Sequence, residues 1–566
     1  GRVGGVAGGA GTAVVRNANS QWHLSDDLNV GVYGTGSLAI QNGGQVSAIH
    51  LYVGRHLDAS GDIVLTGNNS KLTLFGNAHL GGQLGVDGGV GNLTINSGST
   101  ANIQNQLTLW SQGAVNLNGG KLSLGSLNNQ GGQFNWNSGT VEFRTNTVLI
   151  DALLDKLVGT SHTLGNFQTL STFSTAGLVV APGHFTVDGG KVTGHNFTNI
   201  GTTAVVRGSM QMTGDFLNDV QGTFLVGGTS QVSFQGSAQN NGTFILDGVT
   251  AKSSGGTFTN NGIVMGKGRL DHQVINNGVM AVDANQLMTV AGGNNLGHVQ
   301  IAGGRMNVTG QLVNEAQGLI TGHGVLATST SSPGAVGLFN NGVVAISGNN
   351  FEIHGDVRNT SSGRIITSGN ATTTFWDDVE HNGDEIRTSL GSSTVFYGSV
   401  TGAAPYTGLG SVFFEGDLKP GNSPANVMFE GNLYFGSTAS LDMELGGVLA
   451  GSEHDRLTVH GDIFLDGSLY IDLINGFKPN YGDEFLLIDN RGLNSIYGQF
   501  DGLDHGSIFT SLGGQKYLVN YQAGVNGRGF ALTAVPEPSA TILVLLTAGI
   551  VAVCRRARGV SRQAEV

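Results

Sequence analysis

The densest group of residues that could do chemistry in this 566-residue chain lies between positions 376 and 385. Five carboxylates fall within it: Asp377, Asp378, Glu380, Asp384 and Glu385. Hard cations such as Ca²⁺ are held by about six to eight oxygen ligands, and a pair of carboxylates can hydrolyse a glycosidic bond. These five residues are therefore the candidates for a calcium site and, in second place, for acid–base catalysis.

The same segment contains His381-Asn382-Gly383, a turn that recurs along the chain. A recurring turn predicts that the carboxylates decorate a solvated loop of one repeat. On this interpretation the chain has no metal site, no cofactor and no catalytic residue, and bound calcium stays the open alternative. Asp455, with Glu453 and His454, and the loop containing Asp501, Asp504 and His505 are given the same structural interpretation.

Catalytic sequence motifs are absent elsewhere. The chain contains no Gly-x-Ser-x-Gly, no His-Glu-x-x-His and no phosphate-binding Gly-x4-Gly-Lys-Ser/Thr. Its one cysteine, Cys554, excludes a disulfide framework and a cysteine-based zinc site. We therefore predict that the protein is not an enzyme. A carbohydrate-active enzyme, a polysaccharide lyase or a glycoside hydrolase, is the alternative.

Composition indicates an extended β structure. Glycine accounts for 95 residues and proline for eight, while 39% of the chain is hydrophobic. Short alternating apolar runs favour packed strands over disorder, and long hydrogen-bonded ladders tolerate little proline. The net charge is −13 and only 11% of residues are charged. An acidic chain without basic runs argues against nucleic acid as a partner.

The C-terminal end has three consecutive parts. Pro536, Glu537 and Pro538 form a stiff, extended motif. An apolar run from Ala540 to Cys554 follows, shorter than the ~20 residues of a stable transmembrane helix. Arg555, Arg556 and Arg558 come next, and by the positive-inside rule they stay cytoplasmic while the body lies outside. The membrane segment is assigned to Ala540, Ile542, Leu543, Val544, Leu545, Leu546, Ile550, Val551, Val553 and Cys554.

This order resembles the PEP-CTERM sorting signal of Gram-negative bacteria. The resemblance implies export across the inner membrane, transient residence of the tail in that membrane, and processing by the membrane enzyme exosortase. It also implies a place at the cell surface or in the extracellular matrix, associated with biofilm or exopolysaccharide. The sequence begins at Gly1 without a signal peptide, so we expect that an N-terminal signal is missing or has been removed.

Internal repeats decide the expected fold. From residue 161 to 404, Asn-containing turns recur in steps of about 20 residues, as in Phe197-Thr-Asn199, Asn240-Asn241-Gly242 and Asn340-Asn341-Gly342. Such a step is the length of one coil of a parallel β-solenoid. We expect Asn-Gly to supply left-handed backbone in these turns, and stacked asparagines to bond from coil to coil.

Residues 1–145 carry a longer cassette, in which Gly36-Ser-Leu-Ala-Ile40 is echoed by Gly91-Asn-Leu-Thr-Ile95. The offset predicts two to three coils per cassette. Between the two blocks, the spacing of Leu149, Ile150, Leu153, Leu154 and Leu157 predicts a short helix over 146–160. The cassettes are similar to those of autotransporter passenger domains.

Residues 405–534 change character, with Lys419-Pro420-Gly421 near the start and His454-Asp455 further on. This segment resembles the end region of autotransporter-like solenoids, which covers the open edge of the last coil. The sorting tail occupies 535–566. The predicted fold is thus all-β: a right-handed parallel β-helix with a β-rich C-terminal cap and a C-terminal apolar sorting helix.

The predicted function is structural or adhesive, with surface polysaccharide as the expected partner besides exosortase and the inner membrane. A calcium-stabilised adhesin is a third hypothesis.

Overall fold

The computed structural model describes residues 1–143, 147–149, 172–175, 178–181, 184–187, 191–329, 334–360, 362–421 and 424–536. Every helix or strand in these ranges is a β-strand. The chain divides into two compact units, unit 1 (Gly1–Leu312) and unit 2 (Val313–Val566).

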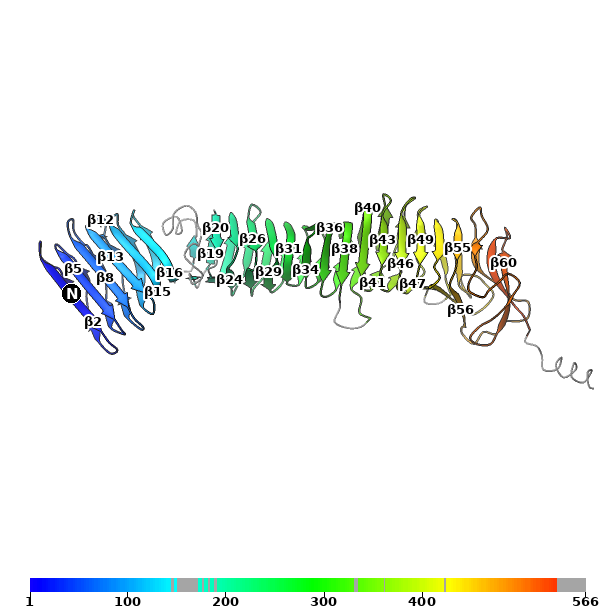
Figure 1. The fold of residues 1–566 in the computed structure, drawn as a ribbon, viewed down its shortest axis with the longest axis horizontal. Helices are drawn as coiled ribbons and strands as arrows, with labels where there is room; N and C mark the ends of the chain where they lie inside the picture. Colours follow the sequence, from blue (N-terminus) through cyan, green and yellow to red (C-terminus); the bar gives the residue numbers. More distant parts are fainter. Residues whose placement is uncertain are drawn as a thin grey trace, which may run out of the picture. The chain divides into compact units, whose positions relative to one another are not determined.

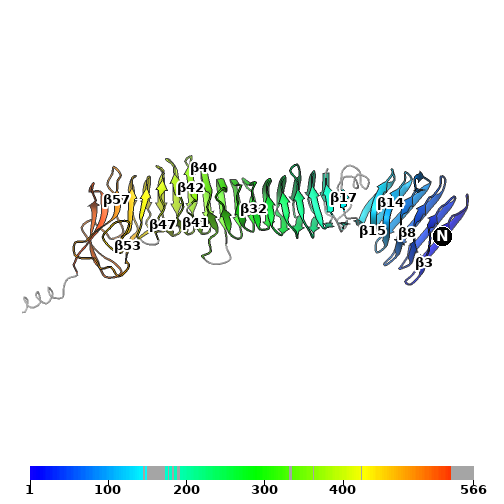
Figure 2. The same cartoon turned by 180° about the vertical axis from the view of Figure 1, so that it is seen from behind.

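Both units are parallel β-solenoids. One coil of unit 1 contains β22 (Asn196–Asn199), β23 (Thr202–Val205) and β24 (Ser209–Met212), and the next coil repeats the three strands in the same order. Asn199 pairs in parallel register with Asn218, so one sequence repeat is one coil. The coil therefore has three faces, called faces 1, 2 and 3 in chain order (Figures 1 and 2). The expected all-β solenoid built from repeats is confirmed.

Strands of unit 1 are given by face. Face 1 contains β1 (Arg2–Val3), β4 (Leu28–Val30), β7 (Leu51–Val53), β10 (Ala78–Leu80), β17 (Thr147–Leu149), β19 (Leu178–Ala181), β22, β25 (Phe216–Asn218), β28 (Ala238–Asn240), β30 (Phe258–Asn260), β32 (Val274–Asn276) and β35 (Gly293–Asn295). Face 2 contains β2 (Ala10–Arg16), β5 (Thr35–Gln41), β8 (Ser60–Thr66), β13 (Val90–Asn96), β20 (His184–Val187), β23, β26 (Thr223–Gly227) and β33 (Val279–Asp283). Face 3 contains β3 (Gln21–His23), β6 (Gln45–Ala48), β9 (Lys71–Leu74), β18 (Thr172–Thr175), β21 (Lys191–Gly194), β24, β27 (Gln231–Phe234) and β34 (Leu287–Val290).

Some strands of unit 1 run across a corner and belong to more than one face. They are β14 (Thr100–Leu109), β15 (Gly113–Asn129), β16 (Gln133–Phe143), β29 (Thr243–Gly255), β31 (Ile263–Asp271) and β36 (His298–Val308). A small antiparallel hairpin of β11 (Gly82–Gln83) and β12 (Val86–Asp87) projects from one coil. The short strand β37 (Leu312–Asn314) includes the unit boundary.

Unit 2 repeats this arrangement. Face 1 contains β39 (Leu338–Asn340), β41 (Val357–Asn359), β44 (Val379–His381), β47 (Val400–Gly402), β50 (Asp417–Pro420), β53 (Ser440–Leu445) and β56 (Ser468–Leu473). Face 2 contains β42 (Arg364–Ser368), β45 (Glu385–Thr388), β48 (Tyr406–Thr407), β51 (Asn426–Phe429), β54 (Arg456–Val459) and β57 (Glu484–Asn490). Face 3 contains β43 (Thr372–Phe375), β46 (Ser393–Phe396), β49 (Ser411–Phe414), β52 (Asn432–Phe435), β55 (Ile463–Leu465) and β58 (Tyr497–Gly498), while β38 (Leu319–Thr328) and β40 (Val343–His354) cross from face 2 to face 3.

The core is a narrow column of apolar side chains. Alternate residues of each strand point inward, and like residues lie above like because the coils are in register. On face 3 of unit 2, the rings of Phe375, Phe396, Phe414 and Phe435 stack at centroid distances of 5.0, 5.3 and 5.4 Å. Offset stacking of buried rings stabilises neighbouring coils beyond the area that they bury.

Turn glycines serve a different purpose from the one we predicted. The glycines of the Asn-Gly turns, such as Gly242, Gly262 and Gly278, do not have left-handed φ angles, so this expectation is wrong for them. A Cβ on Gly262 would instead lie 2.1 Å from the carbonyl oxygen of Gly242. These glycines are needed because successive turns stack in direct backbone contact. Left-handed backbone occurs elsewhere, for example at Asn42 and Asn285.

The long cassette of the first block corresponds to two coils, since Gly36 pairs with Gly61 and Gly61 with Gly91. The expected helix over 146–160 lies outside the described residues except at its start, where Thr147–Leu149 forms strand β17 and pairs with β19. Residues 405–534 begin as regular coils that continue as far as β57 on face 2.

The last coils are followed by an antiparallel sheet. β61 (Gly529–Ala534) pairs with β57 and with β60 (Lys516–Ala523), and β59 (Ile508–Thr510) pairs with β60. Tyr517 and Phe530 of this sheet are fully buried, and the Phe530 ring contacts Phe500. Antiparallel β61 thus covers one edge of β57, which blunts a strand that would otherwise be open to pairing.

Candidate functional site

A ladder of buried asparagines runs along face 1 of unit 1. Each side-chain Nδ2 donates to Oδ1 of the asparagine one coil further on, at 2.7 Å in every step. The ladder contains Asn199, Asn218, Asn240, Asn260, Asn276 and Asn295, all at most 1% exposed. Nδ2 of Asn240 also donates to the carbonyl of Ile263, so the amide holds the turn as well. The expected coil-to-coil asparagine bonding is confirmed.

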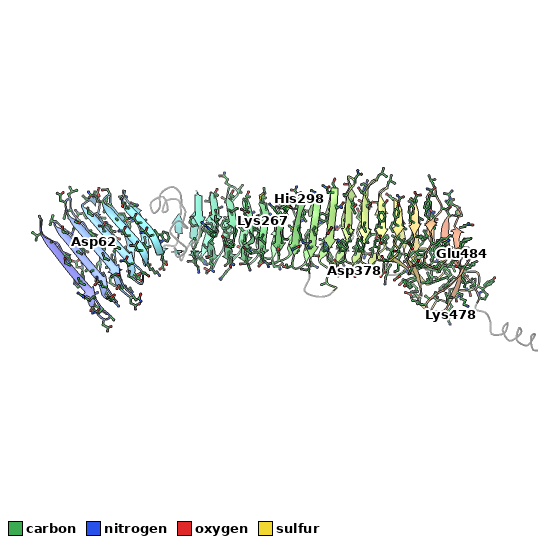
Figure 3. All side chains as sticks on the ribbon, in the orientation of Figure 1. Asp62, Lys267, His298, Asp378, Lys478 and Glu484 are labelled. Carbon is green, nitrogen blue, oxygen red and sulfur yellow. The ribbon has the colours of Figure 1, made fainter. Side chains whose placement is uncertain are left out.

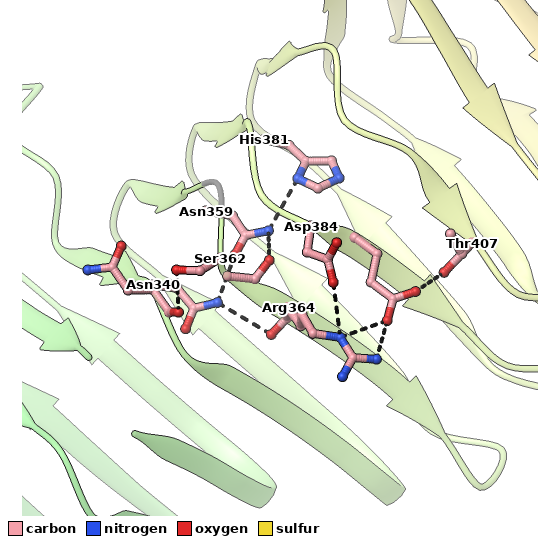
Figure 4. Close-up of polar contacts among 10 residues, drawn as sticks. Asn340, Asn359, Ser362, Arg364, His381, Asp384 and Thr407 are labelled. Carbon is pink, nitrogen blue, oxygen red and sulfur yellow. Dashed lines mark hydrogen bonds and ion pairs between the residues drawn. The ribbon is translucent and has the colours of Figure 1, made fainter. Parts of the chain in front are cut away.

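Buried asparagines also form a ladder on face 1 of unit 2, and this ladder reaches a histidine. Asn314 donates to Asn340 at 2.8 Å, and Asn340 donates to Asn359 at 2.7 Å. Nδ2 of Asn359 then lies 3.2 Å from Nδ1 of His381, which occupies the next ladder position (Figure 4). The amide can only donate through Nδ2, so His381 accepts at Nδ1 and must be neutral.

The second nitrogen of His381 completes its environment. Nε2 lies 3.1 Å from the carbonyl oxygen of Pro405 and donates to it. The ring of Tyr406 meets the imidazole edge-on at a centroid distance of 5.1 Å. Burial lowers the pKa of His381 to about 4, and the bond to Pro405 only partly opposes this. His381 is therefore a fixed, uncharged hydrogen-bonding group.

Among the five predicted carboxylates, Asp377 and Asp378 hold turns of neighbouring coils. Oδ2 of Asp377 accepts from the backbone N–H of Gly355 at 2.7 Å, and Oδ1 of Asp378 accepts from that of Ser399 at 2.9 Å. Asp378 lies at the edge of the coils, where face 3 turns into face 1 (Figure 3). Each carboxylate satisfies a backbone donor left over at a turn.

The other three carboxylates meet arginines of the preceding coil. Glu380 pairs with Nε of Arg358 at 2.6 Å. Arg364 donates through Nε to Glu385 at 2.9 Å, through a second nitrogen to the same carboxylate, and lies 3.6 Å from Asp384 (Figure 4). Burial of Glu385 opposes its ionisation, but hydrogen bonds from Thr407 and Arg364 outweigh it and lower its pKa. The five carboxylates are thus distributed among four partners, two backbone N–H groups and two arginines, and Asp384 and Glu385 share Arg364.

A shallow groove of about 220 Å³ lies beside this segment, lined among others by Asp356, Arg358, Asp378, Glu380 and Thr401. Burial, followed by the charge of Asp378, raises the pKa of Asp356. The Arg358–Glu380 ion pair occupies the groove wall. Within the described ranges, no three His, Cys, Asp or Glu side chains gather as metal ligands would.

His454 and Asp455 fasten a loop to the coils. Asp455 is completely buried, and its two oxygens accept from the backbone N–H groups of Ala425 and Glu444, each at 2.7 Å. Burial raises the pKa of Asp455 to about 7 despite these two bonds. Nδ1 of His454 bonds to the carbonyl of Gly447 at 3.1 Å. In the other loop, Nδ1 of His505 accepts from the backbone N–H of Tyr521 at 3.1 Å. The backbone N–H of Asp501 donates to the carbonyl of Gly467, and the carbonyl of Asp504 accepts from the N–H of Ser507.

Outward-facing aromatic stacks on unit 2 were not predicted. Trp376 and Tyr397 stack at 4.6 Å, and Phe413, Tyr434, Phe464 and Tyr497 form a second stack with steps of 4.3, 4.5 and 4.8 Å. Their sequence signal is an aromatic residue recurring one coil apart. Because the ring faces contact one another, these rings mainly hold coils together.

Of the sorting tail, only Val535 and Pro536 belong to the described residues, and Pro536 is exposed. Glu537, Pro538, the apolar run and the arginines lie outside them. In the part of the chain that the structure describes, no helix is long and apolar enough to cross a membrane.

The geometry defines the class of fold, a parallel β-solenoid with an internal asparagine ladder. Comparison with models of known protein families and with curated proteins finds no match to either.

Proposed function

We propose that the chain is an exported, exosortase-sorted bacterial protein of the cell surface or extracellular matrix, with a structural or adhesive role. The observation that carries the proposal is the order of the tail: Pro536-Glu537-Pro538, the apolar run to Cys554, and Arg555, Arg556 and Arg558. That order resembles the PEP-CTERM sorting signal.

Features of the two units support a structural role. Carboxylates of residues 376–385 hold neighbouring coils together. Asp377 and Asp378 accept hydrogen bonds from backbone N–H groups, and Glu380 and Glu385 pair with arginines. A solenoid stabilised by repeated contacts between neighbouring coils offers long polar surfaces. Such surfaces suit many weak contacts with a matrix polymer.

The test is expression in a host that has exosortase, beside the same host lacking it. Cell fractions are separated and the intact mass of the protein is measured in each. In the host with exosortase, and only there, we expect a protein outside the inner membrane that has lost the residues after the Pro-Glu-Pro motif. Full-length chain in the inner membrane of both hosts would contradict sorting. A Glu537→Ala variant that is no longer processed would connect the cleavage to the motif.

The alternative is a carbohydrate-active enzyme. Asp378 and Glu380 both line the groove of about 220 Å³, which favours this alternative because a pair of carboxylates can hydrolyse a glycosidic bond. Release of reducing ends or unsaturated sugars from polysaccharide, abolished by Glu380→Gln, would support this alternative over the structural role.

A further inference from the structure

A groove of about 390 Å³ lies along three consecutive coils of unit 1, where face 3 turns toward the next coil. This volume lies in the range of about 300–1,000 Å³ that is typical of ligand sites. Two rows of side chains line it. Row A contains Thr193, Gln211 and Ser233, which pair in register on β21, β24 and β27, and row B contains His195, Thr213 and Gln235, two residues further along each coil.

Hydrogen-bonding capacity is left open in both rows. The side chains of Gln211, Ser233 and Gln235 make no hydrogen bond within the described structure. In row B, Thr213 donates weakly to the carbonyl of Gly194 at 3.5 Å and lies 3.0 Å from Nδ1 of His195. Nε2 of His195 has no hydrogen-bond partner among the described residues.

The lining selects a chemical class of ligand. None of the described residues that line the groove is an aspartate, glutamate, lysine or arginine, so this lining holds no fixed charge that would compensate the charge of an ionic ligand. Hydroxyl and carboxamide groups both donate and accept, as the hydroxyl groups of a sugar do. The backbones of β21, β24 and β27 are already engaged in parallel pairing, so an extended peptide finds no free strand edge there.

We propose that this groove binds a segment of a neutral polysaccharide. The inference rests on the proposed function, because it names the class of matrix polymer that the exported body would contact. The repeat of the coils presents equivalent groups at steps of about 4.8 Å, which suits a polymer lying along rows A and B.

The test is native gel electrophoresis of the full chain through gels containing hydroxyethylcellulose, dextran or galactomannan, beside alginate as an acidic polysaccharide. At least one neutral polymer is expected to retard the protein and alginate is not. The triple variant Gln211→Ala/Ser233→Ala/Gln235→Ala is expected to lose affinity by at least about ten-fold, because three hydrogen bonds to the polymer are lost. Ser233→Arg, which fills the groove, should have the same effect.

The matched control is Gln300→Ala, an exposed glutamine on β36 of the same unit and outside the groove. Its retardation should equal that of the unmodified chain, and thermal melts check that all variants fold. Absence of retardation by every neutral polymer, retardation by alginate alone, or an unchanged triple variant would each overturn the inference. Binding is measured on purified protein, so its failure is separate from failure of the sorting experiment.

Discussion

Nδ2 of Asn359 lies 3.2 Å from Nδ1 of His381, so the buried amide ladder of unit 2 ends on an imidazole that must stay unprotonated. Protonation at Nδ1 would place two donors against each other in a site that is 1% exposed. The repeat position occupied by asparagine in the preceding coils is thus sensitive to acid in this coil.

Stability should fall with acidification through this residue. Burial lowers the pKa of folded His381 to about 4 from an ordinary 6.5. Between these values the unfolded chain binds the proton and the folded chain does not, so stability rises with pH across this window and is flat below it. The effect is of order 3 kcal/mol. Urea unfolding at pH 7.5 and 4.5 should show a smaller pH difference for His381→Asn than for the unmodified chain. Equal differences would contradict the assignment.

Breaking the ladder in unit 1 should be costly. Asn240→Ala removes a group that bonds to Asn218, Asn260 and two backbone carbonyls, and it leaves buried partners unsatisfied. We expect a loss of about 2–4 kcal/mol in the free energy of unfolding. The control is Asn241→Ala, one residue along and half-buried, which removes a side chain that accepts only from Gln239 and Asn261 at the surface and should cost about 1 kcal/mol or less. Chemical denaturation measures both, and similar losses would show that the inner ladder is not special.

Replacing a turn glycine by alanine should lower the stability of the protein, although the φ angles of these glycines are ordinary. Gly262→Ala places a Cβ 2.1 Å from the carbonyl oxygen of Gly242, and we expect destabilisation by about 2 kcal/mol or more. Gly513→Ala is the control, because nothing lies within 4 Å of its added Cβ and its φ is not left-handed. Melting temperatures of the two variants should differ clearly. Tolerance of alanine at position 262 would mean that the turns can separate.

Removal of calcium by a chelator should leave the melting temperature unchanged, because the five carboxylates of residues 377–385 already have partners within the protein. Glu385 and Glu380 each face an arginine, and Asp377 and Asp378 each accept from a backbone N–H. Melting temperatures with EDTA and with added CaCl₂ should therefore agree. Arg364→Ala, by contrast, should destabilise by about 1 kcal/mol at low salt, because Glu385 loses its partner. A marked rise in melting temperature with calcium would instead favour the calcium-stabilised adhesin.

The repeats alone determined much of the fold. Steps of about 20 residues between Asn-containing turns, such as Gly242 to Gly262, correspond to single coils, because apolar alternation fixes which residues face the core and the turn fixes where each strand ends. The buried asparagine ladder was also predictable, since an asparagine that recurs once per coil must meet its own equivalents.

Tertiary structure decided the rest. Only the packing of turns shows that Gly262 is needed for contact between backbones. A left-handed φ angle and a close approach of another backbone both require glycine, so the sequence does not show which of the two applies. Only the register between coils shows that Asn240 is inside and Asn241 outside, and that Glu385 belongs to Arg364 and Glu380 to Arg358. Partners one coil apart are about 20 residues away in the chain, so local sequence cannot show which carboxylate is paired and which is free.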